Sequence, residues 1–380
     1  MDIKLSEDQL EMQRQARRFC ENEMPMTYVR AMFEDERGFT DELWNKMVEM
    51  GWTAMLLPEA YGGLGMELQD MTVVLEELGR TVSPGPLFST VLLAASAIAE
   101  AGNDAQKQKY LPAIAEGKIR GTLALHEAES GADPGYIMME AIEKGDGFNL
   151  TGTKLFVPDA HVSDFMICAV RTEKGTDPEK GITLLLIDAK TPGVEISLLP
   201  TMDGTRKLCA VEFKNVTIGK EAVLGEVNRG WDSLKKVMRK AQVGLCAECV
   251  GGAERAMEIA AEYAKVRVQF DQPIGSYQAI KHRCAQMYID VESSRSLLYW
   301  ASWAQDHCDD QEAAIAASAA KVYCTEAYRN VSASAIQVLG GTGFSWEHDI
   351  HFYLKRAKAN EVALGDLAYH REQVISLVAQ

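Results

Sequence analysis

The chain has 380 residues, 47% of them hydrophobic and 25% charged. This length and composition favour a globular protein with two or three packed regions and argue against a disordered chain. The formal net charge of −16 argues against nucleic acid as a partner, because binding phosphates requires concentrated basic surface.

Residues 1–118 are predicted to form an N-terminal helical domain. Ser6 followed by Gln9 has the spacing of a capping box, and apolar residues then recur every three or four positions. Two further segments, DELWNKMVEMGW and LQDMTVVLEELGRTV, repeat the amphipathic pattern. The polar start has no signal-peptide core, and no stretch approaches the ~18 apolar residues of a membrane span. We therefore expect no membrane contact and a cytoplasmic chain.

Residues 119–228 are predicted to form a middle β domain, because the apolar period changes to two. GITLLLID and LCAVEFKNVTI are short β-rich runs, and turn clusters such as EKGTDPEKG separate the runs of this region. In the second run Cys209, Val211 and Phe213 alternate with polar or small residues, as in a half-buried strand. We expect an antiparallel barrel or sandwich.

Residues 229–380 are predicted to form a C-terminal helical bundle domain. Long alanine-rich segments run to the end, and only Pro273 breaks them. The order helix, strand, helix predicts an α+β fold rather than a βαβ sheet. No GxGxxG motif follows a predicted strand, so a Rossmann nucleotide site is not indicated.

The eight cysteines are scattered, and only Cys246 and Cys249 lie close together, on adjacent turns of a predicted helix. This spacing favours buried, reduced thiols over a metal or redox site, and a reducing compartment. We expect no bound metal.

Four groups of motifs occur in order along the chain. They are LWNKMVEMGW with PEAYGGLG and EELGR, LALHEAESGAD with LTGTKLFV, EYAKVRVQFDQPIGSYQAIKHRCAQM, and QVLGGTGFSWEHDIHFYLKRAKANEVALGDLAYHR. Together they resemble the acyl-CoA dehydrogenase family over the whole length of the chain. The resemblance implies that family's fold, with a helical domain, a middle β-barrel and a helical bundle. It also implies FAD, a CoA thioester substrate, and an oligomer in which one subunit completes its neighbour's cofactor site.

By motif position, the resemblance places six residues at the pyrophosphate and adenine half of FAD. A guanidinium pairs well with phosphate oxygens, and glycines permit close backbone approach. A helix-end arginine and a helix-breaking turn are the structural alternatives. The six residues are Arg267, Phe270 and Gln278, which would meet a neighbouring subunit's FAD, and Gln337, Gly340 and Gly341.

The match on the flavin-ring side departs from the family pattern. Phe156 replaces the usual tryptophan against the ring, or is simply a core residue of the barrel. Pro158 replaces a threonine and offers neither hydroxyl nor N–H. His126 and Ala132 replace a threonine and a serine of the loop motif. Leu125 and His126 would still offer main-chain donors and acceptors to the ring.

The family's catalytic base is also replaced. Its YEGT-like run, which carries the glutamate that removes the α-proton, falls on residues 363–366, so that Leu364 stands at the base position. Some members carry the base on the long helix before the RxxF motif, and that position is Ala241. A dehydrogenase needs such a carboxylate, together with donors that polarise the thioester carbonyl.

Two acidic residues are candidates for the relocated base. Asp366 lies two residues past Leu364, and Glu248 lies seven residues past Ala241, on the same helical face but ~10 Å further along. Their structural alternatives are a turn or cap aspartate and a polar residue in a helix or interface. Glycines on the same helix predict close packing of an acyl chain or of another helix; they are Gly244, Gly251 and Gly252.

Three functions are consistent with these observations. The first is acyl-CoA dehydrogenation with electrons passed to an electron-transfer flavoprotein, by a homo-oligomer or by a mixed oligomer with a homologous subunit. The second is a catalytically silent subunit that completes the FAD site of an active homologue in a mixed tetramer. The third keeps FAD and CoA but performs an elimination or desaturation elsewhere on the acyl group. The sequence does not choose the acyl group.

Overall fold

The computed structural model describes residues 5–129 and 131–379. Residues 1–4, Ser130 and Gln380 belong to predicted segments but lie outside the described residues. The first helix begins at the predicted capping box, since Ser6 Oγ accepts from Gln9 N at 3.1 Å and Gln9 Oε1 accepts from Ser6 N at 3.0 Å. The helices of the first region are α1 (Glu7–Glu23), α2 (Met26–Glu34), α3 (Asp41–Glu49), α4 (Leu68–Arg80), a π-helical segment (Ser89–Ala95), α5 (Ser96–Ala101) and α6 (Asp104–Ala115).

Two four-stranded sheets follow. Their strands are β1 (Gly121–Ala124), β2 (Ala141–Glu143), β3 (Gly147–Pro158), β4 (Phe165–Arg171), β5 (Ile182–Asp188), β6 (Val194–Leu199), β7 (Leu208–Gly219) and β8 (Val223–Leu224). The strand orders are β1-β4-β5-β8 and β2-β3-β7-β6, and the inward side chains of both sheets share one apolar core. Along β7 the predicted alternation is confirmed, with Cys209, Val211 and Phe213 buried.

The prediction of an antiparallel sheet is wrong for one pair of strands. β1 and β4 run parallel, with Gly121 opposite Phe165 and Ala124 opposite Cys168. A parallel pair requires a long crossover, and the segment between these strands, which contains β2 and β3, supplies it.

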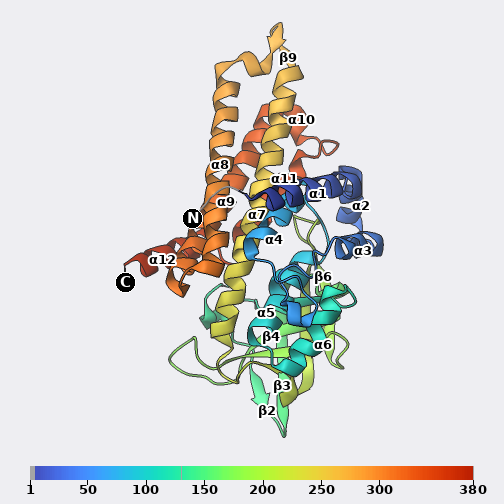
Figure 1. Cartoon of the computed structure of the whole chain (residues 1–380), viewed down its shortest axis with the longest axis vertical. Helices are drawn as coiled ribbons and strands as arrows, with labels where there is room; N and C mark the ends of the chain where they lie inside the picture. Colours follow the sequence, from blue (N-terminus) through green and yellow to red (C-terminus); the bar gives the residue numbers. More distant parts are fainter. Residues whose placement is uncertain (1–4, 130, 380) are drawn as a thin grey trace. The chain divides into compact units, whose positions relative to one another are not determined.

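Long helices form the last region, as predicted. They are α7 (Gly230–Val266), α8 (Gln278–His307), α9 (Asp310–Leu339), the short α10 (Gly341–Phe344), α11 (Ile350–Val362) and α12 (Leu367–Val378). Pro273 lies in the hairpin of β9 (Val268–Gln269) and β10 (Gln272–Pro273), which separates α7 from α8. Figure 1 shows α8 and α9 running alongside one another, with β9 at the far end of α7 and α8. The α+β order of elements is therefore confirmed.

The chain packs as two compact units, each assembled from separate segments. One comprises the described residues of 1–31, 68–83 and 242–380, and the other comprises 32–67 and 84–241. The division into 1–118, 119–228 and 229–380 follows the order of elements along the chain and remains a prediction. Among the described residues, the helices are all too short or too polar to cross a membrane.

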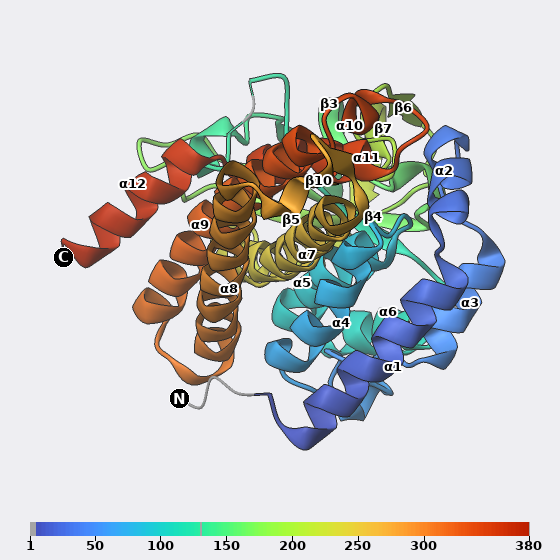
Figure 2. The same ribbon diagram turned by 90° about the horizontal axis from the view of Figure 1, so that it is seen from above.

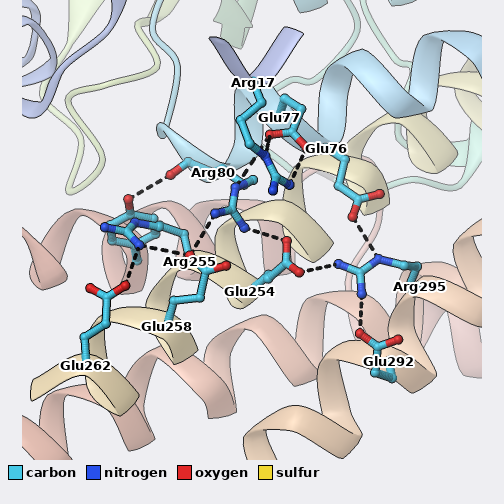
Figure 3. A network of polar contacts seen from close by, with 11 residues as sticks. Arg17, Glu76, Glu77, Arg80, Glu254, Arg255, Glu258, Glu262, Glu292 and Arg295 are labelled. Carbon is cyan, nitrogen blue, oxygen red and sulfur yellow. Dashed lines mark hydrogen bonds and ion pairs between the residues drawn. The ribbon is translucent and has the colours of Figure 1, made fainter. Parts of the chain in front are cut away.

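A network of ion pairs joins α1, α4, α7 and α8 within the first unit (Figure 3). Figure 2 shows α1 beside α4, where Arg17 pairs with Glu77 at 2.8 Å. Arg80 of α4 reaches α7 and contacts Glu254 at 2.5 Å and Glu258 at 2.7 Å. The network thereby connects N-terminal helices to the C-terminal bundle.

Glycines let α4 approach α7 very closely. A Cβ on Gly251 would lie 1.7 Å from the main-chain oxygen of Glu76, and a Cβ on Gly79 would lie 2.2 Å from that of Glu248. A Cβ on Gly252 would meet the ring of Tyr328 on α9. The sequence predicted that either an acyl chain or another helix packs against these glycines. At Gly251 and Gly252 the structure shows neighbouring helices.

Candidate functional site

The residues predicted for the flavin-ring side lie together in the β domain. After β1 the chain runs beside β3, where Leu155 N donates to His126 O at 2.8 Å. The Leu125 side chain is buried, and Pro158 at the end of β3 is half-buried. The carbonyl of Pro158 accepts from Thr122 Oγ1 at 2.5 Å, which fastens the end of β3 to β1. The structure thus brings Leu125, His126, Phe156 and Pro158 into one region.

Phe156 is turned out of the core by an irregularity in β3. The register of β3 against β7 shifts between Lys154 and Val157, and Phe156 has a left-handed φ of 54°. A bulge of this kind re-aims a side chain, and the ring is 47% exposed. The alternative that Phe156 is a barrel core residue is therefore wrong. The exposed ring is available for stacking.

An ion pair between a buried lysine and a half-buried glutamate fixes the loop next to this ring. Lys154 is fully buried, and its Nζ donates to Glu127 Oε1 at 2.5 Å and to Leu125 O at 3.1 Å. The same carboxylate oxygen accepts from the main-chain N–H groups of Met138 and Met139, both at 3.0 Å. Sequence reasoning missed this pair, although a lysine at an inward position of a predicted strand is a usable signal.

The His126 side chain has a buried nitrogen, Nδ1, without a hydrogen-bond partner in the described part of the chain. Burial, reinforced by the positive charge of Lys154, lowers the pKa of His126, so the ring is neutral near pH 7. Buried polar atoms usually find partners, so a polar ligand fits this position.

The residues predicted for the adenine half of FAD lie around an open groove in the helical unit. The groove has a volume of about 540 Å³. Arg267 and Phe270 line it from the α7–α8 connection, and Gly340 and Gly341 line it from the end of α9. The Phe270 side chain is 88% exposed. Gln278 begins α8 just after a residue of the lining, and the exposed Gln337 lies in the last turn of α9.

The two glycines leave this groove open. Cβ atoms built on Gly340 and Gly341 would meet no atom within 4 Å, and Gly340 has a φ of 62° that favours glycine. An arginine, aromatic surface and unobstructed main chain are the groups that a nucleotide pyrophosphate and base require. The residues present therefore fit the adenine half of a dinucleotide.

The candidate base Asp366 lies at the start of α12. Its carboxylate is exposed and caps this helix, with Oδ1 accepting from Tyr369 N at 2.8 Å. Leu364, which the resemblance predicts at the family's base position, is half-buried and has a left-handed φ of 58°, a conformation that costs about 1–2 kcal/mol for a residue other than glycine. Ala241 is fully buried.

The second candidate, Glu248, is buried and engaged in an ion pair. Its Oε2 lies 3.4 Å from Nη1 of Arg356, which is itself 2% exposed and donates to Ser83 O. The structure therefore places Asp366 at a helix N-terminus and Glu248 inside the helical bundle, and each has a structural role.

The cysteines are free, and two lysines near the start of α7 form ion pairs. All eight cysteines are free and six of them are buried, with Cys284 and Cys308 half-buried. Lys235 pairs with Glu179 at 3.1 Å and Lys236 with Glu100 at 2.9 Å, so acids of the same unit neutralise these two lysines.

Family models match nearly the whole chain. The acyl-CoA dehydrogenase N-terminal domain matches residues 6–118, the middle domain 122–216 and the C-terminal domain 228–378. Together with the fold and the two groups of candidate FAD residues, these matches define the class of protein, a FAD-dependent oxidoreductase.

Individual relatives agree with this class. The acyl-CoA dehydrogenase IpdE2 of Mycolicibacterium smegmatis is 32% identical over 93% of this chain and 92% of its own length. The subunit CarC of the caffeyl-CoA reductase-Etf complex of Acetobacterium woodii is 31% identical over 88% of each chain. A chain of the ChsE4-ChsE5 complex of Mycobacterium tuberculosis superimposes with a TM-score of 0.89 at 27% identity, covering 100% of this chain and 99% of that one. The chain belongs to the acyl-CoA dehydrogenase family, and its fold and FAD-dependent dehydrogenase chemistry follow.

Proposed function

We propose that this chain desaturates the acyl group of a CoA thioester between its α and β carbons and passes the electrons to an electron-transfer flavoprotein. The observation that carries the proposal is the pairing of two features on adjoining segments of the β domain: the exposed Phe156 side chain, a stacking surface, and the buried Nδ1 of His126, which has no hydrogen-bond partner among the described residues. A relative named as a subunit of an Etf complex supports the choice of electron acceptor.

In this proposal FAD, when bound, supplies the acceptor of the β-hydride. Phe156 packs against the ring, and Leu125 and His126 offer main-chain and imidazole groups to its polar edge, while Pro158 offers only its ring surface. The Lys154–Glu127 pair keeps this loop in place, because three main-chain groups of the loop, those of Leu125, Met138 and Met139, converge on the two charges.

The adenine half of the cofactor is held across a subunit interface in an oligomer of this chain. Arg267 pairs with the pyrophosphate, and Phe270 and Gln278 contact the nucleotide. Gln337, Gly340 and Gly341 complete the cradle through main-chain contacts. The open groove that these elements border supports this assignment.

Removal of the α-proton requires a carboxylate, which we assign to Asp366. The carboxylate is exposed and lies two residues from the family's base position, whereas Glu248 is less suited because Arg356 holds its charge in the bundle. Main-chain N–H groups are the donors that would stabilise the developing enolate.

The proposal is tested with the purified chain alone. It predicts bound FAD whose visible absorbance bleaches when an acyl-CoA is added, and dye reduction that depends on the thioester. Product formation without consumption of an electron acceptor would instead identify the elimination chemistry. Purified protein without FAD and without thioester-dependent reduction would overturn the proposal.

A second candidate function is a silent subunit in a mixed oligomer. It is favoured by the engagement of both acids, since Asp366 caps a helix and Glu248 is ion-paired, while Leu364 and Ala241 are apolar. A structural relative is a chain of the ChsE4-ChsE5 complex, which supports the mixed oligomer that this function requires. Expression alone and together with a homologous dehydrogenase separates the two, because the silent-subunit function fails if the chain alone forms an active homo-oligomer.

A further inference from the structure

The turn that follows α11 is held by a buried lysine. Lys321 of α9 is 0% exposed, and its Nζ donates to three main-chain carbonyls, those of Asn360 at 3.1 Å, Glu361 at 3.3 Å and Gly365 at 3.0 Å. An ammonium has three donors, and all three are used here. Two of the acceptors belong to the last turn of α11, where carbonyls lack helical partners and the helix dipole favours a cation.

Two more side chains hold the carbonyl of Leu364 in the same turn. Gln242 Nε2 of α7 donates to Leu364 O at 3.1 Å, and His370 Nε2 of α12 donates to the same oxygen at 3.0 Å. His370 is 1% exposed, and burial, with the charge of Lys321, lowers its pKa to about 4. The ring is therefore neutral, donates from Nε2 and accepts at Nδ1 from Ser318 Oγ at 3.2 Å.

This arrangement immobilises the turn from three helices at once. The carbonyls of 360, 361, 364 and 365 all receive side-chain donors, and none of these donors comes from the turn itself. A buried ammonium is a costly way to fill a core position that methionine would fill without desolvation. The three hydrogen bonds to the turn are the contribution of Lys321 that a methionine would not provide.

We propose that Lys321, with Gln242 and His370, is a positioning residue that fixes the 363–366 turn, so that Leu364 forms a rigid apolar boundary for the acyl group. This rests on the proposed function, which makes Asp366 of the same turn the base and so places the turn at the acyl group. A rigid wall discriminates acyl chains by size, since a chain that is too long cannot be accommodated by a shift of the turn. If the turn is mobile, the enzyme discriminates less between acyl chains of different length.

The test uses Lys321→Met in the full-length protein, with Lys358→Met as the matched control. Lys358 lies on α11, is 44% exposed and pairs with Glu361 at 3.4 Å, so its loss removes a surface ammonium near the same turn. Hydrogen–deuterium exchange of peptides spanning 360–367 and kcat/KM for straight-chain acyl-CoA thioesters of increasing length are measured on each protein.

We expect Lys321→Met to speed exchange of the turn by about tenfold or more, while the control stays at the wild-type rate. We also expect the preference for the best thioester over one two carbons longer to shrink by about fivefold, and kcat to fall as well, because the turn that becomes mobile also carries Asp366. Should Lys321→Met not fold, Gln242→Met removes one donor to Leu364 O, and the same two shifts are expected at smaller size.

The outcomes separate the parts of the proposal. If the turn exchanges at the wild-type rate in both variants, Lys321 does not fix the turn and this part of the proposal is overturned. Faster exchange with an unchanged chain-length profile overturns the role of Leu364 as a boundary. Wild-type protein that turns over no thioester overturns the proposed function and with it the role of Leu364, while the exchange rates still decide whether Lys321 fixes the turn.

Discussion

The Glu76 carboxylate on α4 accepts a hydrogen bond from Arg295 Nε on α8 at 2.9 Å, while its other oxygen, Oε2, has no partner in the described part of the chain. Glu76 is fully buried, and Arg295 also contacts Glu254 at 3.1 Å and pairs with Glu292 (Figure 3). Glu77 and Tyr299 face the same pair. Burial raises the pKa of Glu76 to about 7, so this half-satisfied carboxyl titrates near neutral pH.

This relationship predicts how stability depends on pH. Because the pKa of Glu76 is raised on folding, the folded state holds its proton more tightly, and this contribution to stability is lost as pH rises from about 4.5 to about 7. Glu76→Gln keeps an acceptor for Arg295 but does not titrate. We therefore expect the free energy of unfolding of Glu76→Gln, relative to that of wild type, to rise by about 1–3 kcal/mol as the pH is raised from 5 to 8.

Denaturant midpoints at several pH values measure this effect. Glu292→Gln is the control, because Glu292 contacts the same arginine but is 45% exposed. If the stability curves of wild type and Glu76→Gln ran parallel between pH 5 and pH 8, Glu76 would not be the titrating group.

Asp366 can be tested as a base separately from its role as a cap. Asparagine is a good helix cap, so Asp366→Asn should change the free energy of unfolding by less than about 0.5 kcal/mol, whereas Asp366→Ala should cost about 1 kcal/mol. If Asp366 removes the α-proton, Asp366→Asn lowers thioester-dependent dye reduction by about 10²–10⁴-fold. Unchanged turnover in the asparagine variant would leave Asp366 as a cap alone.

Removal of the Glu248 carboxylate is expected to destabilise the helical bundle. Glu248→Gln leaves the buried Arg356 guanidinium without its carboxylate, and we expect a loss of about 2–4 kcal/mol in chemical denaturation. The control is Glu262→Gln, because Glu262 is 63% exposed and its pair with Arg255 is long, at 3.5 Å. Equal effects of the two substitutions would contradict the importance of the buried pair.

Because α4 and α7 approach closely, adding one methyl group at Gly251 is expected to lower the stability of the fold strongly. Alanine is normally favoured over glycine in a helix by about 1 kcal/mol, but a Cβ on Gly251 would lie 1.7 Å from Glu76 O. Gly251→Ala should therefore lower the free energy of unfolding by about 2–4 kcal/mol through displacement of the helices. Gly175→Ala, in open space, should change it little. Thermal unfolding of both variants decides between these expectations.

Arg267 is expected to matter for FAD and little for folding. Arg267 is exposed, so Arg267→Leu should leave the melting temperature of the cofactor-free protein unchanged and weaken FAD binding by about tenfold or more, as expected for a lost charge-assisted phosphate contact. Arg14→Leu, which removes a 65% exposed arginine from α1, is the control. Titration with FAD followed by flavin fluorescence gives both affinities, and equal affinities would remove Arg267 from the cofactor site.

The elements that local sequence determines were predictable. The capping box at Ser6 and Gln9 and the alternation along β7 depend on spacing alone, and both are confirmed. The parallel pairing of β1 with β4 was not predictable, because it joins strands about 40 residues apart and their local patterns say nothing of direction. The motifs nevertheless gave the family correctly.

The site was less predictable than the fold because it depends on departures from periodicity. A period-two pattern cannot show that β3 bulges at Phe156, and the exposure of that ring follows from the bulge. Lys154 with Glu127, and Lys321 with its three carbonyls, are contacts between residues 27 or more positions apart. Such pairs become visible only when the backbone brings their elements together.

The left-handed backbone at Leu364 limits which amino acids the position accepts. Valine, isoleucine and threonine are strongly disfavoured at a φ of 58°, while side chains that are not branched at Cβ, glutamate as well as leucine, share the same moderate penalty. An acidic and an apolar residue are therefore interchangeable here without rebuilding the surrounding helices. A single substitution at this position can add or remove a carboxylate while the backbone keeps its conformation.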